Sequence, residues 1–101
     1  MMKNKTVYEK ICFEIISAAG TAKSCYLEAV EHAKNKEDYE SVIKEGNAAF
    51  IQAADAHSTA LQLDADENLD TGLLLIHAET ILSSAETVRD LTKYIIQLLA
   101  N

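Results

Sequence analysis

Histidine and cysteine have the widest chemistry of the side chains in this sequence, and its 101 residues contain only three histidines and two cysteines. His77 stands in the middle of the apolar run "GLLLIHAETILSSA", residues 72–85. A neutral imidazole near pH 7 serves as a nucleophile, a general base or a metal ligand. On an apolar helix it is either a core residue held by one hydrogen bond, the more frequent case, or a reactive group on a rigid support.

The helical neighbours of His77 limit the reactions that it could support. The residues three and four positions from His77 are Leu73, Leu74, Thr80 and Ile81, and Ser84 lies seven positions after it. None of them is a carboxylate or a thiol, which argues against a hydrolytic triad and against a metal site within one chain. His57 and His32 belong to the two preceding helical segments, and we interpret both as structural residues.

The two cysteines are predicted to be buried, unpaired thiols. Cys12 and Cys25 belong to one predicted helix and are 13 residues apart. At about 1.5 Å of rise per residue they are roughly 20 Å apart, and a disulfide requires Cα atoms within about 7 Å. Neither has another metal ligand at a useful spacing.

Charge and hydropathy restrict the partners of the chain. It is 49% hydrophobic and 25% charged with a net charge of −7, which is typical of one globular domain, predicted over residues 1–101. An acidic chain repels nucleic-acid phosphates and anionic membranes. No apolar stretch approaches the roughly 20 residues that span a bilayer, and the N-terminus lacks the apolar core of a signal peptide. We expect a cytoplasmic protein without nucleic-acid partners or membrane insertion.

Three heptad patterns organise the chain into helices. Apolar or small residues recur in alternating steps of three and four over 8–32, 39–63 and 74–99, the last pattern including Ile95. The segment "KNKEDYE", with Asn35 as the expected N-cap of the second helix, and the segment "DADENLDTG" separate them. Short connections make neighbouring helices antiparallel. The sequence therefore predicts an all-α fold, an up-down-up antiparallel three-helix bundle.

Two features concern the packing of these helices. Gly20 and Gly46 lie inside helices, where glycine costs about 1 kcal/mol relative to alanine, so we expect another backbone to approach closely at each. The third helix is apolar nearly all round over residues 73–82, and two partner helices cover only part of a helix. A symmetric homo-oligomer would cover the remainder.

Three segments resemble a known family. They are "AAGTAKS" at 18–24, "ADAHSTAL" at 54–61 and "LIHAETILSSAETVRDLTKYIIQL" at 75–98. They are similar to the lactose/cellobiose-type IIA components of the bacterial sugar phosphotransferase system. Family members read A-G-[DE]-A-[RK]-S in the first helix, E-A-H in the second, and H-[AG]-Q-D-H-L-M-T in the third. The resemblance extends over nearly the whole chain.

The resemblance implies a homotrimer of three-helix bundles and a phosphotransferase function. His77 matches the histidine that accepts a phosphoryl group from the histidine phosphocarrier protein. The group then passes to a cysteine of the cognate IIB component, for uptake of a disaccharide such as cellobiose, lactose or chitobiose. An imidazole suits this role because its phosphoramidate transfers readily.

The first five residues of the third motif depart from the family at three positions. H-[AG]-Q-D-H is replaced by "HAETI", residues 77–81. The aspartate that helps to hold an axial metal ion in family members is Thr80 here, so we expect no metal and no other cofactor. The glutamine is Glu79, which we expect to face the His77 of a neighbouring chain and to modulate transfer.

Two alternatives stay open. The chain could be a diverged relative that no longer transfers phosphate and acts as a regulatory, partner-binding bundle. It could also be a histidine phosphotransfer domain of a two-component pathway. Such domains usually carry a lysine or arginine three residues after the histidine, and this position is Thr80. Phosphoryl uptake by His77 would distinguish an active phosphocarrier from the relative that no longer transfers phosphate.

Overall fold

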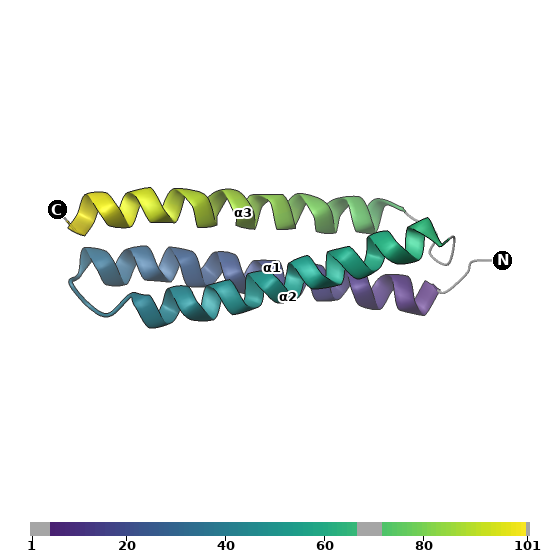
Figure 1. The fold of residues 1–101 in the computed structure, drawn as a ribbon, viewed down its shortest axis with the longest axis horizontal. Helices are drawn as coiled ribbons and strands as arrows, with labels where there is room; N and C mark the ends of the chain where they lie inside the picture. The colour runs from purple at the N-terminus through teal and green to yellow at the C-terminus, as the bar shows by residue number, and fades with distance from the viewer. Residues whose placement is uncertain (1–4, 67–71, 101) are drawn as a thin grey trace.

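The computed structural model describes residues 5–66 and 72–100, and all three of its elements are helices. They are α1 (Lys5–Lys34), α2 (Glu40–Ala65) and α3 (Leu73–Ala100). Figure 1 shows α1 and α3 running in one direction and α2 in the other, in a rod of 57 × 17 × 17 Å. The all-α, up-down-up architecture predicted from the heptad patterns is confirmed.

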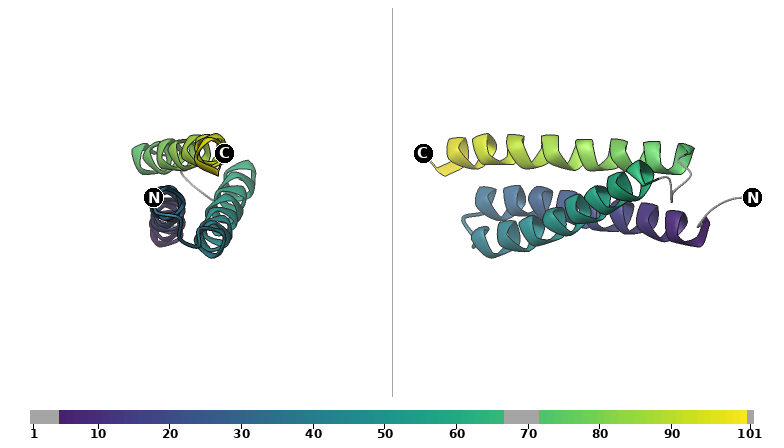
Figure 2. Two further views of the ribbon diagram at one scale, coloured as in Figure 1. Left: turned by 90° about the vertical axis from the view of Figure 1, so that its left-hand side faces the viewer. Right: turned by 45° about the vertical axis from the view of Figure 1, so that its right-hand side comes forward.

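The central element of the bundle is α1, which packs along both other helices, whereas α2 and α3 make few contacts with each other. Figures 1 and 2 show why: α2 begins beside the end of α1 and leans across it, so that only its last turns come close to the start of α3. The C-terminal half of α3 therefore packs mainly on α1, with side-chain contacts to α2 such as that of Arg89 over the Phe50 ring at 4.5 Å.

Small side chains form most of the core. The buried residues of α2 are Val42, Gly46, Ala53, Ala56 and Ala60, and all lie on the predicted heptad pattern. On α3 the pattern predicts a buried Ile95, but Ile95 is 41% exposed while Ile96 is only 7% exposed. The same offset is present at the start of the helix, where Leu75 is 5% exposed in the core although the pattern places Leu74 there. Leu75 and Ile96 are three heptads apart, so the core face of α3 lies one residue beyond this half of the predicted pattern along the whole helix.

The turn after α1 shows that the predicted role of Asn35 as the N-cap of α2 is wrong. Its N–H donates to the carbonyl oxygens of Glu31 at 3.1 Å and His32 at 3.2 Å, so it continues the end of α1. Lys36 then adopts a φ of 62°, and the N–H of Glu37 donates to the His32 carbonyl oxygen at 2.8 Å. These are the features of a Schellman cap. Because this left-handed residue must come between the helices, Asn35 stands too early to cap α2.

Asp38 caps the start of α2 instead. The side chain of Tyr39, at the N-cap position, makes no capping hydrogen bond. The Asp38 carboxylate accepts hydrogen bonds from the Glu40 N–H at 3.1 Å and the Ser41 hydroxyl at 2.8 Å. Both hydrogen bonds lower the pKa of Asp38, and the bond from the Ser41 hydroxyl has the larger effect. His32 Nδ1 donates to the Asp38 carbonyl oxygen at 2.8 Å, which supports a structural role for this histidine.

The two helical glycines have different surroundings. A Cβ at Gly46 would lie 3.0 Å from the Cβ of Cys25 and 3.1 Å from the ring of Tyr26, so the close approach of α1 is confirmed there. At Gly20 nothing in the described chain lies within 4 Å of such a Cβ, and the expected approach is wrong within one chain. The heptad patterns separate the two cases, because Gly46 lies on the second pattern whereas Gly20 falls between Ala18 and Ala22 of the first.

The start of α3, which carries His77, is tied to α1. The Tyr8 hydroxyl accepts a hydrogen bond from the Leu75 N–H at 3.0 Å, and this satisfies one of the N–H groups that a helix start leaves without a helical partner. Leu75 itself is 5% exposed and packs with Cys12 and Ala60. The predicted acidic connection before α3 lies mostly outside the described residues.

Candidate functional site

His77 lies in the second turn of α3, and its side chain is exposed. The next residue, Ala78, has no exposed surface and belongs to a core cluster that joins all three helices. Adjacent residues of a helix point about 100° apart, so the packing of Ala78 determines where the imidazole projects. The structure therefore presents the His77 imidazole to solvent from a helix that the core packing of Ala78 holds in place.

Two polar side chains lie near the His77 side of α3. Ser84 follows His77 by seven residues, and its hydroxyl accepts a hydrogen bond from the ammonium group of Lys23 at 3.1 Å. Because Lys23 comes from α1, this bond brings a positive charge to α3 about two helical turns, roughly 10 Å, from His77. The Thr80 hydroxyl donates to the carbonyl oxygen of Ile76 at 3.0 Å.

Glu79 pairs with His57 of α2. His57 Nε2 donates to Glu79 Oε2 at 2.7 Å, and the two side chains are 25% and 41% exposed. Residues two apart on a helix point about 200° apart, so Glu79 faces α2 while His77 faces away from it. Within one chain the partner of Glu79 is therefore His57, and the predicted contact with the His77 of a neighbouring chain stays a prediction.

An apolar hollow of about 520 Å³ opens beside this pair, where the end of α2 meets the start of α3. Leu61, Leu73 and Ile76 line it together with the carboxylates of Glu79 and Asp64. The three apolar side chains are 51%, 83% and 58% exposed. The turn of α3 that carries His77 is thus bordered by apolar surface that solvent reaches.

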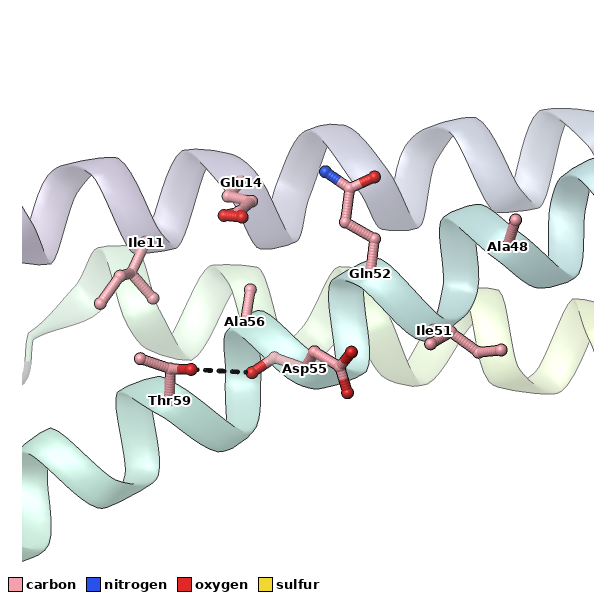
Figure 3. A pocket seen from close by; sticks show the side chains of 8 residues that line it. All are labelled: Ile11, Glu14, Ala48, Ile51, Gln52, Asp55, Ala56 and Thr59. Atoms are coloured by element: carbon pink, nitrogen blue, oxygen red, sulfur yellow. Dashed lines mark hydrogen bonds between the residues drawn. The ribbon is translucent and has the colours of Figure 1, made fainter.

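A second groove lies between α1 and α2 and is shown in Figure 3. Its volume is about 400 Å³, and its polar groups include Glu14, Gln52 and Asp55. The Thr59 hydroxyl donates to the Asp55 carbonyl oxygen of the same helix at 3.1 Å. No lining residue comes from α3, so this groove is separate from the surface that carries His77.

The thiols provide no second reactive centre. Cys12 and Cys25 are 0% and 7% exposed and unpaired, as the sequence predicts. Burial raises the pKa of both thiols, which favours the unreactive protonated form.

The described residues also lack a ligand set for a metal ion. No group of three or more histidine, cysteine, aspartate or glutamate side chains within residues 5–66 and 72–100 gathers closely enough to hold one. Thr80 presents only a neutral hydroxyl that is already bonded to its own helix. Hard cations prefer carboxylate or carbonyl oxygens, so the residues present do not fit the axial metal of the family.

Comparison with known proteins gives the fold and the site their context. Residues 10–100 match the family described as "PTS system, Lactose/Cellobiose specific IIA subunit". The chain belongs to this family. The "PTS Cellobiose Specific Enzyme IIA from Bacillus anthracis", known from a crystal structure, superposes on this IIA chain with a TM-score of 0.86 and 28% identity. The match covers 99% of this chain and 92% of that protein.

Curated relatives carry several sugar names. The chain is 31% identical over 98 residues to the "PTS system lactose-specific EIIA component" of Staphylococcus epidermidis, with 94% of each chain covered. It is 33% identical over 94 residues to the "Lichenan-specific phosphotransferase enzyme IIA component" of Bacillus subtilis, covering 89% of this chain and 84% of the relative. In the described part of this IIA chain, no helix combines the length and apolarity of a membrane span.

His57 lies close to the candidate site, and the sequence alone did not reveal its partner, Glu79. It occupies the histidine of the E-A-H motif, here "DAH" at residues 55–57. A signal was present, because Glu79 replaces a neutral glutamine and a new carboxylate needs a partner when it is half-buried. Distance in the sequence hid the pair, since the two residues are 22 positions apart.

Proposed function

We propose that this IIA chain is the phosphocarrier of a sugar phosphotransferase system. His77 takes a phosphoryl group from the histidine phosphocarrier protein and passes it to a cysteine of the cognate IIB component. The observation that carries the proposal is the exposed imidazole of His77 on a fixed turn of α3, at the position of the family's histidine. Such a carrier works between cytoplasmic proteins, so the proposal places the chain in the cytoplasm.

For phosphoryl transfer through His77, the main task of the protein is to position the reacting groups. A neutral ring nitrogen of His77 attacks the phosphorus, and the new P–N bond forms as the P–N bond of the donor breaks. In the second step a thiolate of IIB attacks, a P–S bond forms and the imidazole leaves. Phosphoryl transfer depends mainly on alignment and charge stabilisation, which a rigid helix bordered by the apolar residues Leu73 and Ile76 would support by docking partners.

We further propose that the chain assembles as a homotrimer. Exposed apolar residues of α3 recur with heptad spacing at Leu73, Leu91 and Leu98, which are 83%, 54% and 75% exposed. The same spacing includes His77 and Thr80. Packing of this stripe against its copies would cover the apolar surface that α1 and α2 leave open. It would also place His77 near a subunit boundary and Thr80 near the three-fold axis.

The proposed trimer needs no axial metal. Three copies of Thr80 would supply neutral hydroxyls in place of carboxylates that repel one another. We therefore expect a chelator to leave the assembly unchanged. The substitution Thr80→Asp should make it sensitive to the chelator.

The transported sugar is a β-linked disaccharide or a related β-linked sugar. Lactose, lichenan and cellobiose are the sugars that the names of similar proteins specify. Cellobiose, lactose and chitobiose are the candidates to compare in an uptake assay with the cognate membrane component.

The second candidate is a relative that binds partners without transferring phosphate. Glu79, Thr80 and Ile81 favour it, because they replace three polar residues of the family's third motif. A carboxylate near His77 would oppose a phosphoryl group by charge repulsion.

Phosphoryl uptake distinguishes the two candidates. The chain is incubated with phosphoenolpyruvate, enzyme I and the histidine phosphocarrier protein, and its intact mass is measured. We expect the mass of one added phosphoryl group on the wild-type chain and on His32→Ala, and none on His77→Ala. If the wild type stays unmodified while a known IIA component is loaded, the non-transferring function holds.

A further inference from the structure

We propose that His57 is a positioning residue for the phosphoryl site. By holding the Glu79 carboxylate against α2, it reduces the negative charge that a phosphoryl group on His77 meets. The inference starts from the 2.7 Å bond between His57 Nε2 and Glu79 Oε2, and it rests on the proposed role of His77.

The direction of the Glu79 side chain decides how strongly its charge acts near His77. The two residues are on the same turn of α3, and the Glu79 side chain is 41% exposed. Glu79 also borders the hollow lined by Leu61 and Ile76. Apolar walls reduce hydration, so a carboxylate that turned into this hollow would act on neighbouring charges with less screening than in bulk water.

The packing of α2 keeps the His57 ring in place. Its side chain is only 25% exposed, and the neighbouring Ala56 and Ala60 are 8% and 0% exposed in the core. This is the part of α2 that leans toward the start of α3 (Figure 1). A hydrogen bond to a carboxylate is stronger and shorter than one between neutral groups, so the pair directs the Glu79 charge toward α2.

The expected consequence is a longer-lived phosphohistidine. A phosphoryl group carries about −1.5 to −2 charges, as phosphorylated hydroxyl side chains do. In hydrolysis, water forms a P–O bond as the P–N bond breaks, and the ring leaves as neutral imidazole after taking up a proton. A free carboxylate would favour that protonation and repel the phosphoryl group. Pairing with His57 weakens both effects.

A double-mutant cycle tests this role. Wild type, His57→Phe, Glu79→Gln and the double variant are phosphorylated with potassium phosphoramidate, which needs no carrier protein. The loss of the group from His77 is followed by peptide mass spectrometry. We expect His57→Phe to shorten the half-life by on the order of two- to five-fold, as befits one partly screened charge. In the Glu79→Gln background it should have no effect.

Two control variants test whether the effect is specific to the hydrogen bond and to the position of the carboxylate. His57→Gln keeps a side-chain donor for Glu79, so its half-life should stay close to that of the wild type. Glu86→Gln removes the same charge one heptad further along α3, where the carboxylate lies 3.9 Å from Arg89, and it should leave the half-life unchanged.

The outcomes separate positioning from a structural role. If His57→Phe lowers the melting temperature but leaves the half-life unchanged, the pair only joins α2 to α3 and the inference is wrong. If His57→Phe shortens the half-life equally in the wild-type and Glu79→Gln backgrounds, the inference is also overturned, because the effect then does not act through the carboxylate. Chemical loading keeps this test independent of whether the carrier protein loads the wild type.

Discussion

At the scale of single residues, neighbouring groups on one turn of α3 face opposite surroundings. His77 projects into solvent, whereas Glu79 binds His57 of α2 at 2.7 Å. The thiols show the complementary case, because burial turns two reactive groups into inert core residues. The helix face therefore determines whether a polar or ionisable side chain of this chain meets solvent, a partner side chain or the core.

The buried thiols should resist alkylation. Burial raises the pKa of Cys12 and Cys25, so the thiolate, which is the reactive form, is rare in the folded chain. We expect iodoacetamide at about pH 8 to modify both slowly in buffer and rapidly in guanidinium chloride. Peptide mass spectrometry reports each site, and rapid modification of the folded chain would contradict the observed burial.

The same shifts predict a loss of stability in alkali. Burial also raises the pKa of Tyr26. Groups with a raised folded-state pKa keep their protons longer in the folded chain than in the unfolded one. Their contribution is complete below the unfolded pKa and is lost as pH rises through the folded value. The free energy of unfolding in urea should fall above about pH 9. Cys12→Ala should make that fall less steep.

At the scale of the helices, the end of α1, the start of α2 and the close approach at Gly46 determine how these two helices pack. α1 ends with Lys36 in a left-handed conformation, and α2 starts under the carboxylate of Asp38. At Gly46 the two helices approach closely, since a Cβ there would lie 3.0 Å from the Cβ of Cys25. Both features position α2, and through α2 the His57 ring.

Asp38→Ala should weaken the start of α2. The substitution removes the acceptor of the Glu40 N–H and Ser41 hydroxyl bonds, so the melting temperature should fall at neutral pH. Because the pKa of Asp38 is lowered, its stabilisation is present above the unfolded carboxyl pKa. It is lost as pH falls through the folded value. Wild type and variant should therefore converge in stability in acid, and a constant difference would exclude the cap.

Two glycine-to-alanine substitutions should have opposite effects. Gly46→Ala places a Cβ 3.0 Å from Cys25 Cβ and should destabilise the chain by about 1–3 kcal/mol through overpacking. Gly20→Ala meets open space in the single chain and should stabilise it by about 0.5–1 kcal/mol. Urea unfolding measures both. Similar effects of the two would show that the crossing is not where the structure places it.

At the scale of the whole molecule, the rod is too thin to bury its own apolar surface. The bundle is 17 Å across, and α3 has large exposed residues along its length, from Leu73 to Leu98. The described part of the chain has no further helix to cover them. The proposed trimer would remove much of this surface from water.

Leu91→Glu should disrupt the proposed trimer. It places a charge in the apolar stripe of α3, where burial of an unpaired carboxylate costs several kcal/mol. Ile51→Glu is the matched control, because Ile51 is similarly exposed but lies on α2. Analytical ultracentrifugation should show a trimer for the wild type and the control, and a monomer for Leu91→Glu. A trimeric Leu91→Glu would place the interface elsewhere.

The sequence by itself determined the features that depend on local periodicity. The heptad patterns predict three helices and their order, and the apolar run around His77 places the histidine on a helix next to a core alanine. The burial of Cys25, which lies on the first heptad pattern, follows from the same periodicity. These features are predictable because side-chain direction repeats every 3.6 residues along one helix, whatever lies beyond it.

Only the tertiary structure decided which helices meet and where. The pairing of Glu79 with His57 and the burial of Ile96 in place of Ile95 depend on the angles at which the helices cross. These angles result from the packing of side chains on all three helices. No pattern within one helix contains them, so residues 22 positions apart became partners without a local signal.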